Sequence, residues 1–312
     1  MSWPDFPEVS VDVLRMISEL HGLGVETFSR LPSIGRFNAI YLLGDDLILR
    51  VPRNDPHFVA ALTRETVAVP AARAVGVRTP RLIAFDDSLT LLPTPYTVYE
   101  RVRGGALELL GLEPATTPAV YRDLGRDLAR LHSGVEPDSA AGKLGAPNLP
   151  QDDPRSLTQE LAAAGYFSVV EARWLSRRFD RLPPLLQAPG DHRFLHGDTQ
   201  ATNILVRPGS LEYLALIDWG GCGWGDPALD FSGMPLGAVP DVLAGYRELA
   251  ALPDDKSAEA RILRYHLYFA LVNVQNAPQP LHSWGERPLG YLLDTMRFLL
   301  DPPNERWADL RP

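Results

Sequence analysis

The sequence predicts an α+β fold in two lobes: a small, mostly antiparallel sheet with one inserted helix, followed by a larger and mostly helical part. Short strand-like runs gather in the first third of the chain, and Gly44-Asp45-Asp46 supplies a hairpin turn between two of them. From about residue 117 onward, apolar residues recur at helical spacing. Arg103-Gly104-Gly105 provides a hinge, because paired glycines let the backbone turn at little cost. We therefore predict an N-terminal lobe at residues 1–102 and a C-terminal lobe at residues 103–312.

Each element follows from its local pattern. A helix is expected over residues 8–21, where apolar residues repeat every three or four positions. The pattern of His57–Val69 predicts a second helix, which Pro70 should end or kink because proline lacks an N–H and clashes with the preceding turn. The predicted strands of the N-terminal lobe are Val25–Leu31, Asn38–Leu43, Leu47–Val51, Leu82–Phe85 and Tyr96–Val102. The predicted helices of the C-terminal lobe are Ala119–His132, Leu157–Ala164, Val169–Leu182, Val239–Ala250, Ala258–Asn276 and Leu289–Leu300.

Composition narrows the class of protein. The 312 residues suffice for two domains, and 45% hydrophobic with 22% charged residues is the usual balance of a soluble globular protein. There is no run of about 18 apolar residues and no basic, then apolar, N-terminal segment, so we expect neither a membrane partner nor a secretory signal. The net charge of −9 argues against a nucleic-acid partner, because phosphate backbones select basic surfaces. The single cysteine, Cys222, excludes an internal disulfide framework and favours a reducing compartment, so a cytoplasmic location is expected.

Two segments carry most of the functional information. In Phe194–Val206 (FLHGDTQATNILV), Asp198 precedes Asn203 by five positions, and an apolar strand follows. In Leu214–Asp226 (LALIDWGGCGWGD), Asp218 ends an apolar strand. Phosphoryl transfer would need these residue types. One carboxylate must orient the attacking hydroxyl and accept its proton, while a second carboxylate and a neutral amide hold magnesium against the nucleotide phosphates.

These segments resemble the signature of the aminoglycoside phosphotransferase and choline kinase-like family. The motifs that carry the resemblance are His196-Gly197-Asp198 with Asn203, Ile217-Asp218-Trp219, and Gly225-Asp226-Pro227 with Asp230. The resemblance implies the bilobal protein-kinase-like fold and the phosphorylation of small-molecule hydroxyls. It implies that Asp198 is the catalytic base and that Asn203 and Asp218 are the magnesium ligands.

The same resemblance implies supporting roles. Asp230 would brace the catalytic loop from the start of the following helix, with His196 as a second supporting residue. Asp226 is expected to be a turn or helix-capping residue. His132, Trp219, Trp224 and Cys222 are expected to pack or cap rather than to catalyse.

The N-terminal lobe offers candidate nucleotide contacts. Residues 31–41 (LPSIGRFNAIY) resemble the family's nucleotide-covering hairpin, in which Ser33, Gly35 and Asn38 would offer donors to the phosphates. A single glycine in a hairpin is as often an ordinary turn. Residues 96–102 resemble the segment that joins the lobes, where backbone groups of Glu100 and Val102 would read the edge of the base.

The third predicted strand departs from the kinase pattern. Kinase-like folds place a lysine there, which contacts the phosphates and pairs with a glutamate on the inserted helix, whereas this sequence has Arg50. Arginine binds phosphate through two donors but does not replace an ammonium group freely. We expect Arg50 to pair with Glu65, and the Leu-Arg-hydrophobic-Pro-Arg pattern resembles the macrolide-phosphorylating branch of the family. The alternative is that Arg50 and Arg53 are surface charges on an edge strand.

The expected protein is therefore a magnesium-dependent kinase that transfers the γ-phosphate of ATP or GTP to a hydroxyl of a small molecule, with an aminoglycoside or macrolide antibiotic among the acceptors. A nucleotide-binding module of the same fold without catalysis is the first alternative. A protein kinase is a second, but no Arg precedes Asp198 and no Ala-Pro-Glu block follows Asp218. A metal-dependent hydrolase with His196, Asp198 and Asp218 as ligands is a third, and further His or Cys ligands are missing nearby.

Overall fold

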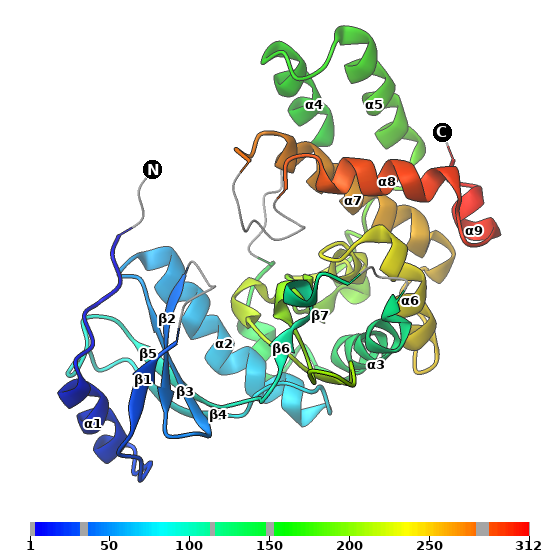
Figure 1. The fold of residues 1–312 in the computed structure, drawn as a ribbon. Helices are drawn as coiled ribbons and strands as arrows, with labels where there is room; N and C mark the ends of the chain where they lie inside the picture. The colour runs from blue at the N-terminus through cyan, green and yellow to red at the C-terminus, as the bar shows by residue number, and fades with distance from the viewer. Residues whose placement is uncertain (1–3, 32–36, 113–115, 148–152, 279–286, 312) are drawn as a thin grey trace.

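The computed structural model describes residues 4–31, 37–112, 116–147, 153–278 and 287–311. It confirms the bilobal α+β fold: an antiparallel sheet with its helices forms the N-terminal lobe, and a mostly helical lobe follows (Figure 1).

The N-terminal lobe is built on a five-stranded antiparallel sheet with the strand order β1-β2-β3-β5-β4. Its strands are β1 (Phe28–Arg30), β2 (Asn38–Leu43), β3 (Leu47–Pro52), β4 (Leu82–Asp86) and β5 (Tyr96–Glu100). Alternate residues of β2 are buried, as the two-residue period of a strand requires. Helix α1 (Val11–Leu20) adds Leu14 and Ile17 to the same apolar cluster as these buried strand residues. Ser10 caps this helix by accepting a hydrogen bond from the backbone N–H of Val13.

Helix α2 (Pro56–Ala74) does not end at Pro70, which was one of the two expected effects of this proline, because the helix continues for another turn beyond it. Pro70 lies on the exposed face, where water can satisfy the carbonyl that loses its partner. On the opposite face Ala68, Val69 and Ala72 are buried in the core of the C-terminal lobe. This burial outweighs the local cost of the proline, and it also joins α2 to the second lobe.

Two predicted strands are shorter than expected. Residues 25–27 lie outside β1, and β5 ends at Glu100 rather than at Val102. The chain leaves β5 through Arg101, whose N–H donates to the carbonyl of Asp46 at 2.7 Å. The segment between the lobes is therefore tied to the β2–β3 turn.

The C-terminal lobe is organised around two helices that approach unusually closely. A Cβ atom on Gly125 of α3 (Pro118–Gly134) would lie 2.0 Å from the Val242 carbonyl oxygen of α6 (Val239–Arg247), so only glycine fits there. The remaining helices are α4 (Pro154–Ala163), α5 (Val169–Arg181), α7 (Ala258–Val274), α8 (Gly290–Leu300) and α9 (Glu305–Ala308). None of the helices in the described ranges is long and apolar enough to cross a membrane.

Two small sheets sit beside these helices and carry the motif segments. One has the order β6-β8-β9, and the other pairs β10 with β7. Their strands are β6 (Gly105–Ala106), β7 (Arg193–Leu195), β8 (Ile204–Val206), β9 (Tyr213–Leu216) and β10 (Gly223–Gly225). The residues of the first two motifs therefore lie on short loops that are fixed at both ends by strands, and Asp230 lies in the 3₁₀ helix after β10.

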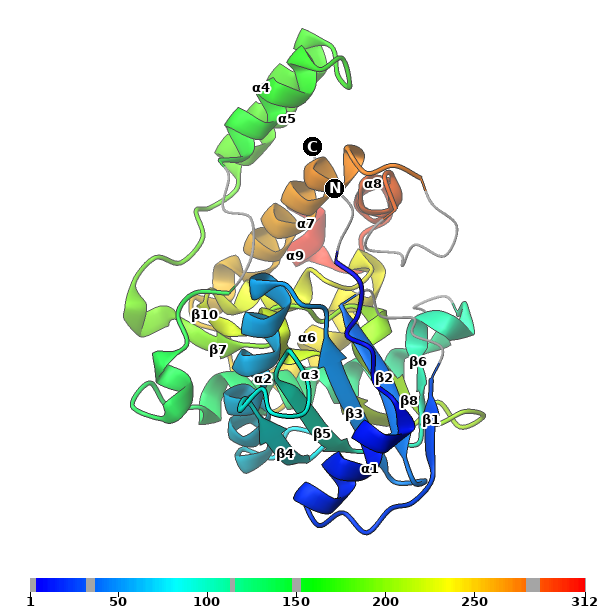
Figure 2. The same ribbon diagram turned by 90° about the vertical axis from the view of Figure 1, so that its left-hand side faces the viewer.

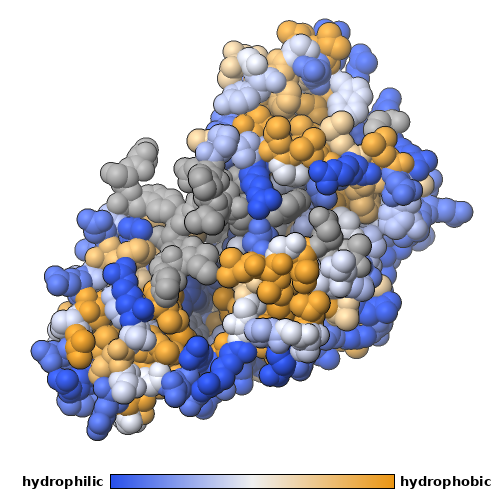
Figure 3. Space-filling view, viewed as in Figure 1, coloured by the Kyte–Doolittle hydropathy of each residue, from blue (hydrophilic) through white to orange (hydrophobic). Residues whose placement is uncertain are grey.

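The α4–α5 hairpin stands away from the rest of the lobe in both ribbon views (Figures 1 and 2). Apolar residues gather on its visible face (Figure 3). The large apolar side chains exposed on it are Tyr166, Val169, Val170 and Trp174.

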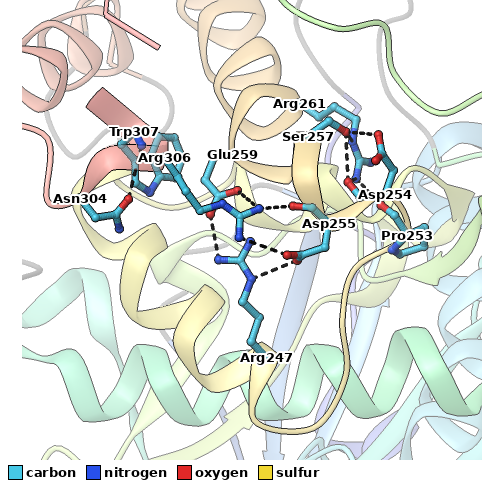
Figure 4. Close-up of polar contacts among 10 residues, drawn as sticks. All are labelled: Arg247, Pro253, Asp254, Asp255, Ser257, Glu259, Arg261, Asn304, Arg306 and Trp307. Atoms are coloured by element: carbon cyan, nitrogen blue, oxygen red, sulfur yellow. Dashed lines mark hydrogen bonds and ion pairs between the residues drawn. The ribbon is translucent and has the colours of Figure 1, made fainter. Parts of the chain in front are cut away.

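The C-terminal helix α9 is held by an ion-pair cluster with α6 and α7 (Figure 4). Arg306 pairs with Asp255 at 3.2 Å and with Glu259 at 3.1 Å, and Arg247 pairs with the same two carboxylates. The neighbouring Trp307 is 1% exposed and packs edge-to-face on Phe298. These contacts make α9 part of the core of the lobe.

Replacing Trp307 with alanine should therefore lower the free energy of unfolding by roughly 3–5 kcal/mol, because a large cavity would remain. Trp174→Ala is the matched control, since Trp174 is 53% exposed and its loss should cost no more than about 0.5 kcal/mol. Urea unfolding of both variants measures the difference. Equal losses would show that α9 is peripheral to stability.

Candidate active site

The catalytic loop lies between β7 and β8, and it holds the Asp198 carboxylate by two amide groups. Gln200 Nε2 donates to Asp198 Oδ1 at 2.8 Å, and Asn203 Nδ2 donates to Asp198 Oδ2 at 3.0 Å. Asn203 Nδ2 also donates to the Asp198 backbone carbonyl at 2.8 Å. Both oxygens of this carboxylate are therefore held by amide groups of the same loop.

Asn203 and Asp218 lie on adjoining backbone segments. The Asn203 carbonyl accepts a hydrogen bond from the Ile217 N–H at 2.9 Å, immediately before Asp218, and β8 pairs with β9 next to this bond. Asp218 has a left-handed backbone, with φ of 68°, which turns the chain sharply at the end of the strand segment. The structure thus brings together the two residues that the sequence nominated as magnesium ligands.

The donor set fits magnesium. The Asn203 side chain uses its nitrogen for the Asp198 contacts. Its oxygen is therefore the atom of the amide that could bind a metal ion. An amide oxygen and a carboxylate are the hard ligands that magnesium takes from protein, and phosphates and water complete its shell. In the described ranges no group of three or more His, Cys, Asp and Glu residues gathers as a metal site.

Arg50 joins the N-terminal lobe to this site. Its Nη1 donates to Glu65 at 2.6 Å, and its Nη2 donates to Asp218 at 3.0 Å. Tyr99 also donates to Glu65, at 3.3 Å. Arg50 is only partly accessible and lies within β3, between β2 and β5, so the edge-strand alternative is wrong.

Burial and neighbouring charges both shift the pKa values of Arg50 and Glu65. Burial opposes the positive charge of Arg50, but Glu65 and Asp218 together raise its pKa above the ordinary value. Burial raises the pKa of Glu65 to about 7; Arg50 opposes this rise and Asp218 adds to it. The arginine therefore stays charged between two carboxylates.

Asp230 braces the catalytic loop from the 3₁₀ helix Pro227–Phe231, which Asp226 caps. Its carboxylate accepts hydrogen bonds from the backbone N–H groups of His196 at 2.8 Å and Gly197 at 2.7 Å. His132 contacts the same carboxylate at 3.0 Å. Burial alone would raise the pKa of Asp230, but the His132 contact, the nearby histidines and the Gly197 N–H hold it below the usual value. Asp230 is therefore an ionised brace.

His196 has no ring nitrogen left for a metal. Its Nε2 lies 3.1 Å from the Ile217 carbonyl, and its Nδ1 accepts from the Asp198 N–H at 3.2 Å. These contacts fit one neutral tautomer, and burial lowers the pKa of His196 in the same sense. This geometry argues against the metal-hydrolase alternative and makes His196 a link between the two motif loops.

Gly197 sets the distance between the same two loops. Its φ is +81°, and a Cβ atom there would lie 2.2 Å from the Gly221 carbonyl oxygen. Only glycine satisfies both the left-handed backbone and the close approach. The close packing of the two loops therefore explains why the middle residue of the His-Gly-Asp motif is glycine.

His266 of α7 contacts Phe231, the residue after Asp230, and should make the free energy of unfolding depend on pH. Its Nε2 lies 3.0 Å from the Phe231 carbonyl, and burial lowers its pKa to about 4. The unfolded chain takes up a proton near pH 6.5, but the folded protein does not until about pH 4. Stability should therefore fall by up to about 3 kcal/mol as the pH drops across this window.

Urea unfolding at pH 7.5, 5.5 and 4.5 tests this prediction. His266→Gln removes the titrating group and keeps a donor for the Phe231 carbonyl, so its stability should depend less on pH than that of the wild type. An unchanged slope in the variant would remove His266 as the cause.

The remaining predicted nucleotide contacts are only partly visible. Ser33 and Gly35 lie outside the described residues, and Asn38 is the first residue of β2. The Glu100 N–H donates to the Arg81 carbonyl at 2.9 Å, and the Val102 carbonyl accepts from the Gly104 N–H at 3.0 Å. These two backbone groups are therefore already used within the protein.

Several contacts in the site were not predicted from the sequence, whereas the packing of Trp219 and Cys222 was. Gln200 was not singled out, although its amide lies two residues after Asp198, and neither was Tyr99, which is 34 positions from Glu65. Trp219 is buried, and burial raises the pKa of Cys222 to about 12, so neither is poised for chemistry. His132 is also buried, and its contact with Asp230 gives it a positioning role that the sequence did not predict.

Comparison with known proteins decides the family. The family model described as "Phosphotransferase enzyme family" matches residues 30–282. The chain belongs to this family. The resemblance to a phosphotransferase family stated from the motifs is thereby confirmed.

Solved structures resemble this chain along nearly its whole length. The GDP complex of aminoglycoside 2′-phosphotransferase-IIIa covers 93% of this chain and 99% of its own, with a TM-score of 0.65 and 16% identity. A choline/ethanolamine kinase family protein from Mesorhizobium loti covers 95% of this chain and 99% of its own, with a TM-score of 0.56 and 19% identity. At these identities the likeness shows the fold.

One relative with similar sequence is named as an acyl-CoA dehydrogenase family member and has a much longer chain. Acyl-CoA dehydrogenase family member 10 of Mus musculus is 25% identical over 237 residues, which is 72% of this chain and 21% of that protein. This chain thus spans about a fifth of the length of that relative.

Proposed function

We propose that the protein transfers the γ-phosphate of ATP or GTP to a hydroxyl group of a small molecule, with magnesium. The observation that carries this proposal is the role of Asn203, which joins the two motif loops. Its side chain holds the Asp198 carboxylate, and its backbone carbonyl binds the residue before Asp218. A base and two metal ligands therefore belong to one hydrogen-bonded assembly.

In this proposal each side chain has a defined task. Asp198 orients the acceptor hydroxyl and takes its proton as the oxygen attacks phosphorus, while Gln200 and Asn203 fix the carboxylate. Arg50, held by Glu65, binds the phosphates and offsets the charge that develops on them. Magnesium bound by Asn203 and Asp218 would neutralise phosphate charge.

The nucleotide contacts are proposed from the hinge and the first hairpin. Glu100 and Val102 would contact the base, and Ser33, Gly35 and Asn38 would contact the phosphates. The similar structures are named as a GDP complex and a streptomycin–ATP complex, so both ATP and GTP are proposed co-substrates.

The acceptor is proposed to be a neutral or cationic hydroxyl compound, in keeping with the net charge of −9. Aminoglycosides and macrolides are the first compounds to test, followed by amino alcohols and sugars. Each is incubated with ATP or GTP and magnesium, and its mass is measured for one added phosphate. Transfer to none of the panel would count against the proposed function.

One feature favours a second candidate, a nucleotide-binding module without catalysis. Arg50 stands where kinase-like folds have lysine. Slow nucleotide hydrolysis in magnesium that disappears in Asp218→Ala supports the enzyme. Tight nucleotide binding with no hydrolysis and no transfer supports the module.

A further inference from the structure

Arg50 makes a contact that its proposed phosphate role does not require. Its guanidinium bridges two carboxylates, from α2 and from the loop after β9. The Glu65 side chain is 2% exposed and the Asp218 side chain 38% exposed, so water reaches this bridge mainly from the Asp218 side. The bridge occupies one carboxylate oxygen of Asp218, the proposed magnesium ligand.

The bridge depends on the shape of arginine. Nη1 serves Glu65 and Nη2 serves Asp218, so two nitrogen atoms about 2 Å apart in one rigid plane hold the two carboxylates separately. A lysine has a single nitrogen on a flexible stem. Arginine at this strand position therefore makes a fixed link that an ammonium would make less well.

The contact to Asp218 competes with metal binding. The guanidinium already supplies positive charge to this carboxylate, at 3.0 Å. A divalent cation on the same carboxylate would meet a positive group, because an arginine guanidinium stays protonated in proteins. The cation can bind well only when Arg50 has moved its Nη2 to another anion.

We propose that Arg50 keeps free divalent cations away from Asp218 until a nucleotide binds. The phosphates of the nucleotide give Nη2 a new anionic partner, Asp218 is released, and the cation enters with the nucleotide. This inference rests on the proposed function, since it takes Asp218 as the metal ligand. It adds a coupling: by linkage, the cation strengthens nucleotide binding as much as the nucleotide strengthens cation binding.

The test uses Mn²⁺ as a spectroscopic probe, with free Mn²⁺ measured by electron paramagnetic resonance. Without nucleotide, the wild type should bind Mn²⁺ at least tenfold more weakly than Arg50→Gln, which keeps a polar side chain but removes the charge. Arg50→Gln combined with Asp218→Asn should lose the gained binding. Glu65→Gln is the matched control, because its amide oxygen still accepts a hydrogen bond from Arg50 Nη1 and Asp218 is unchanged, so it should keep Mn²⁺ out.

A second measurement follows ADP binding in the wild type and in Arg50→Lys. In the wild type, Mn²⁺ should lower the Kd for ADP at least tenfold. This gain should shrink in Arg50→Lys, whose single nitrogen on a flexible stem bridges the two carboxylates less well. Thermal unfolding checks that each variant is folded. Equal nucleotide-free Mn²⁺ binding by the wild type and folded Arg50→Gln would overturn the proposal, as would a gain for ADP that Arg50→Lys keeps in full. A wild type that binds no ADP even with Mn²⁺ would instead count against the proposed function. The comparison of Mn²⁺ binding without nucleotide would still decide whether Arg50 keeps cations away from Asp218.

Discussion

Asp198→Asn should lower kcat for phosphate transfer by a factor of roughly 10²–10⁴, because the acceptor hydroxyl loses the group that takes its proton. Nucleotide affinity should stay within about twofold of the wild type, since the Asp198 carboxylate is bonded to the side chains of Gln200 and Asn203 rather than to Arg50. The acceptor found in the panel serves as substrate, with calorimetry for nucleotide binding.

Asp138→Asn is the matched control, because it makes the same chemical change on an exposed loop. It should leave both kcat and nucleotide affinity unchanged. Full transfer activity in Asp198→Asn would remove Asp198 from the role of base. A parallel loss of nucleotide binding would mean that the substitution distorts the site, and the rate would then say little about proton transfer.

Local patterns predicted the elements whose structure is decided locally. The β2 strand has the predicted bounds Asn38–Leu43, and β3 extends only one residue further, to Pro52. Both segments are short apolar runs joined by a glycine turn, which is the local signature of a hairpin. The same holds for Asp198 and Asn203, because five residues within one short loop settle their contact.

Tertiary contacts decided what the sequence could not show. Pro70 was expected to end or kink α2, but the helix does not end there, because burial of Val69 and Ala72 against the other lobe carries it past the proline. Propensity describes an isolated helix, and packing supplies most of the stability of a real one. No local pattern marks a partner that comes from the other lobe.

The same limit applies to the active site. The pairing of Arg50 with Glu65 followed from the resemblance, but the contact of Arg50 with Asp218 joins residues 168 positions apart. His132 was expected to cap and pack, and its contact with Asp230 spans 98 positions. A single sequence gives residue types and spacing along the chain, whereas these two contacts depend on how the lobes and helices meet.

Asp230→Asn should destabilise the protein by roughly 3–5 kcal/mol and lower kcat by roughly 10–100-fold in the folded fraction. Asp230 is fully buried and accepts from two backbone N–H groups as well as contacting His132. An asparagine presents an amide where an acceptor is needed, so one buried donor loses its partner. The loop that carries Asp198 would then shift by a fraction of an ångström or more, and the base would no longer be aligned.

Asp127→Asn separates the two effects. Asp127 is also fully buried and pairs with Arg78 and Arg130, and none of its hydrogen bonds in the described part of the chain goes to a motif residue. It should cost comparable stability, yet leave kcat unchanged at a temperature where the protein is folded. Urea unfolding and transfer kinetics on both variants give the answer. A normal kcat in folded Asp230→Asn would show that Asp230 stabilises the lobe without positioning the catalytic loop, and the motif aspartate at 230 would be a purely structural residue.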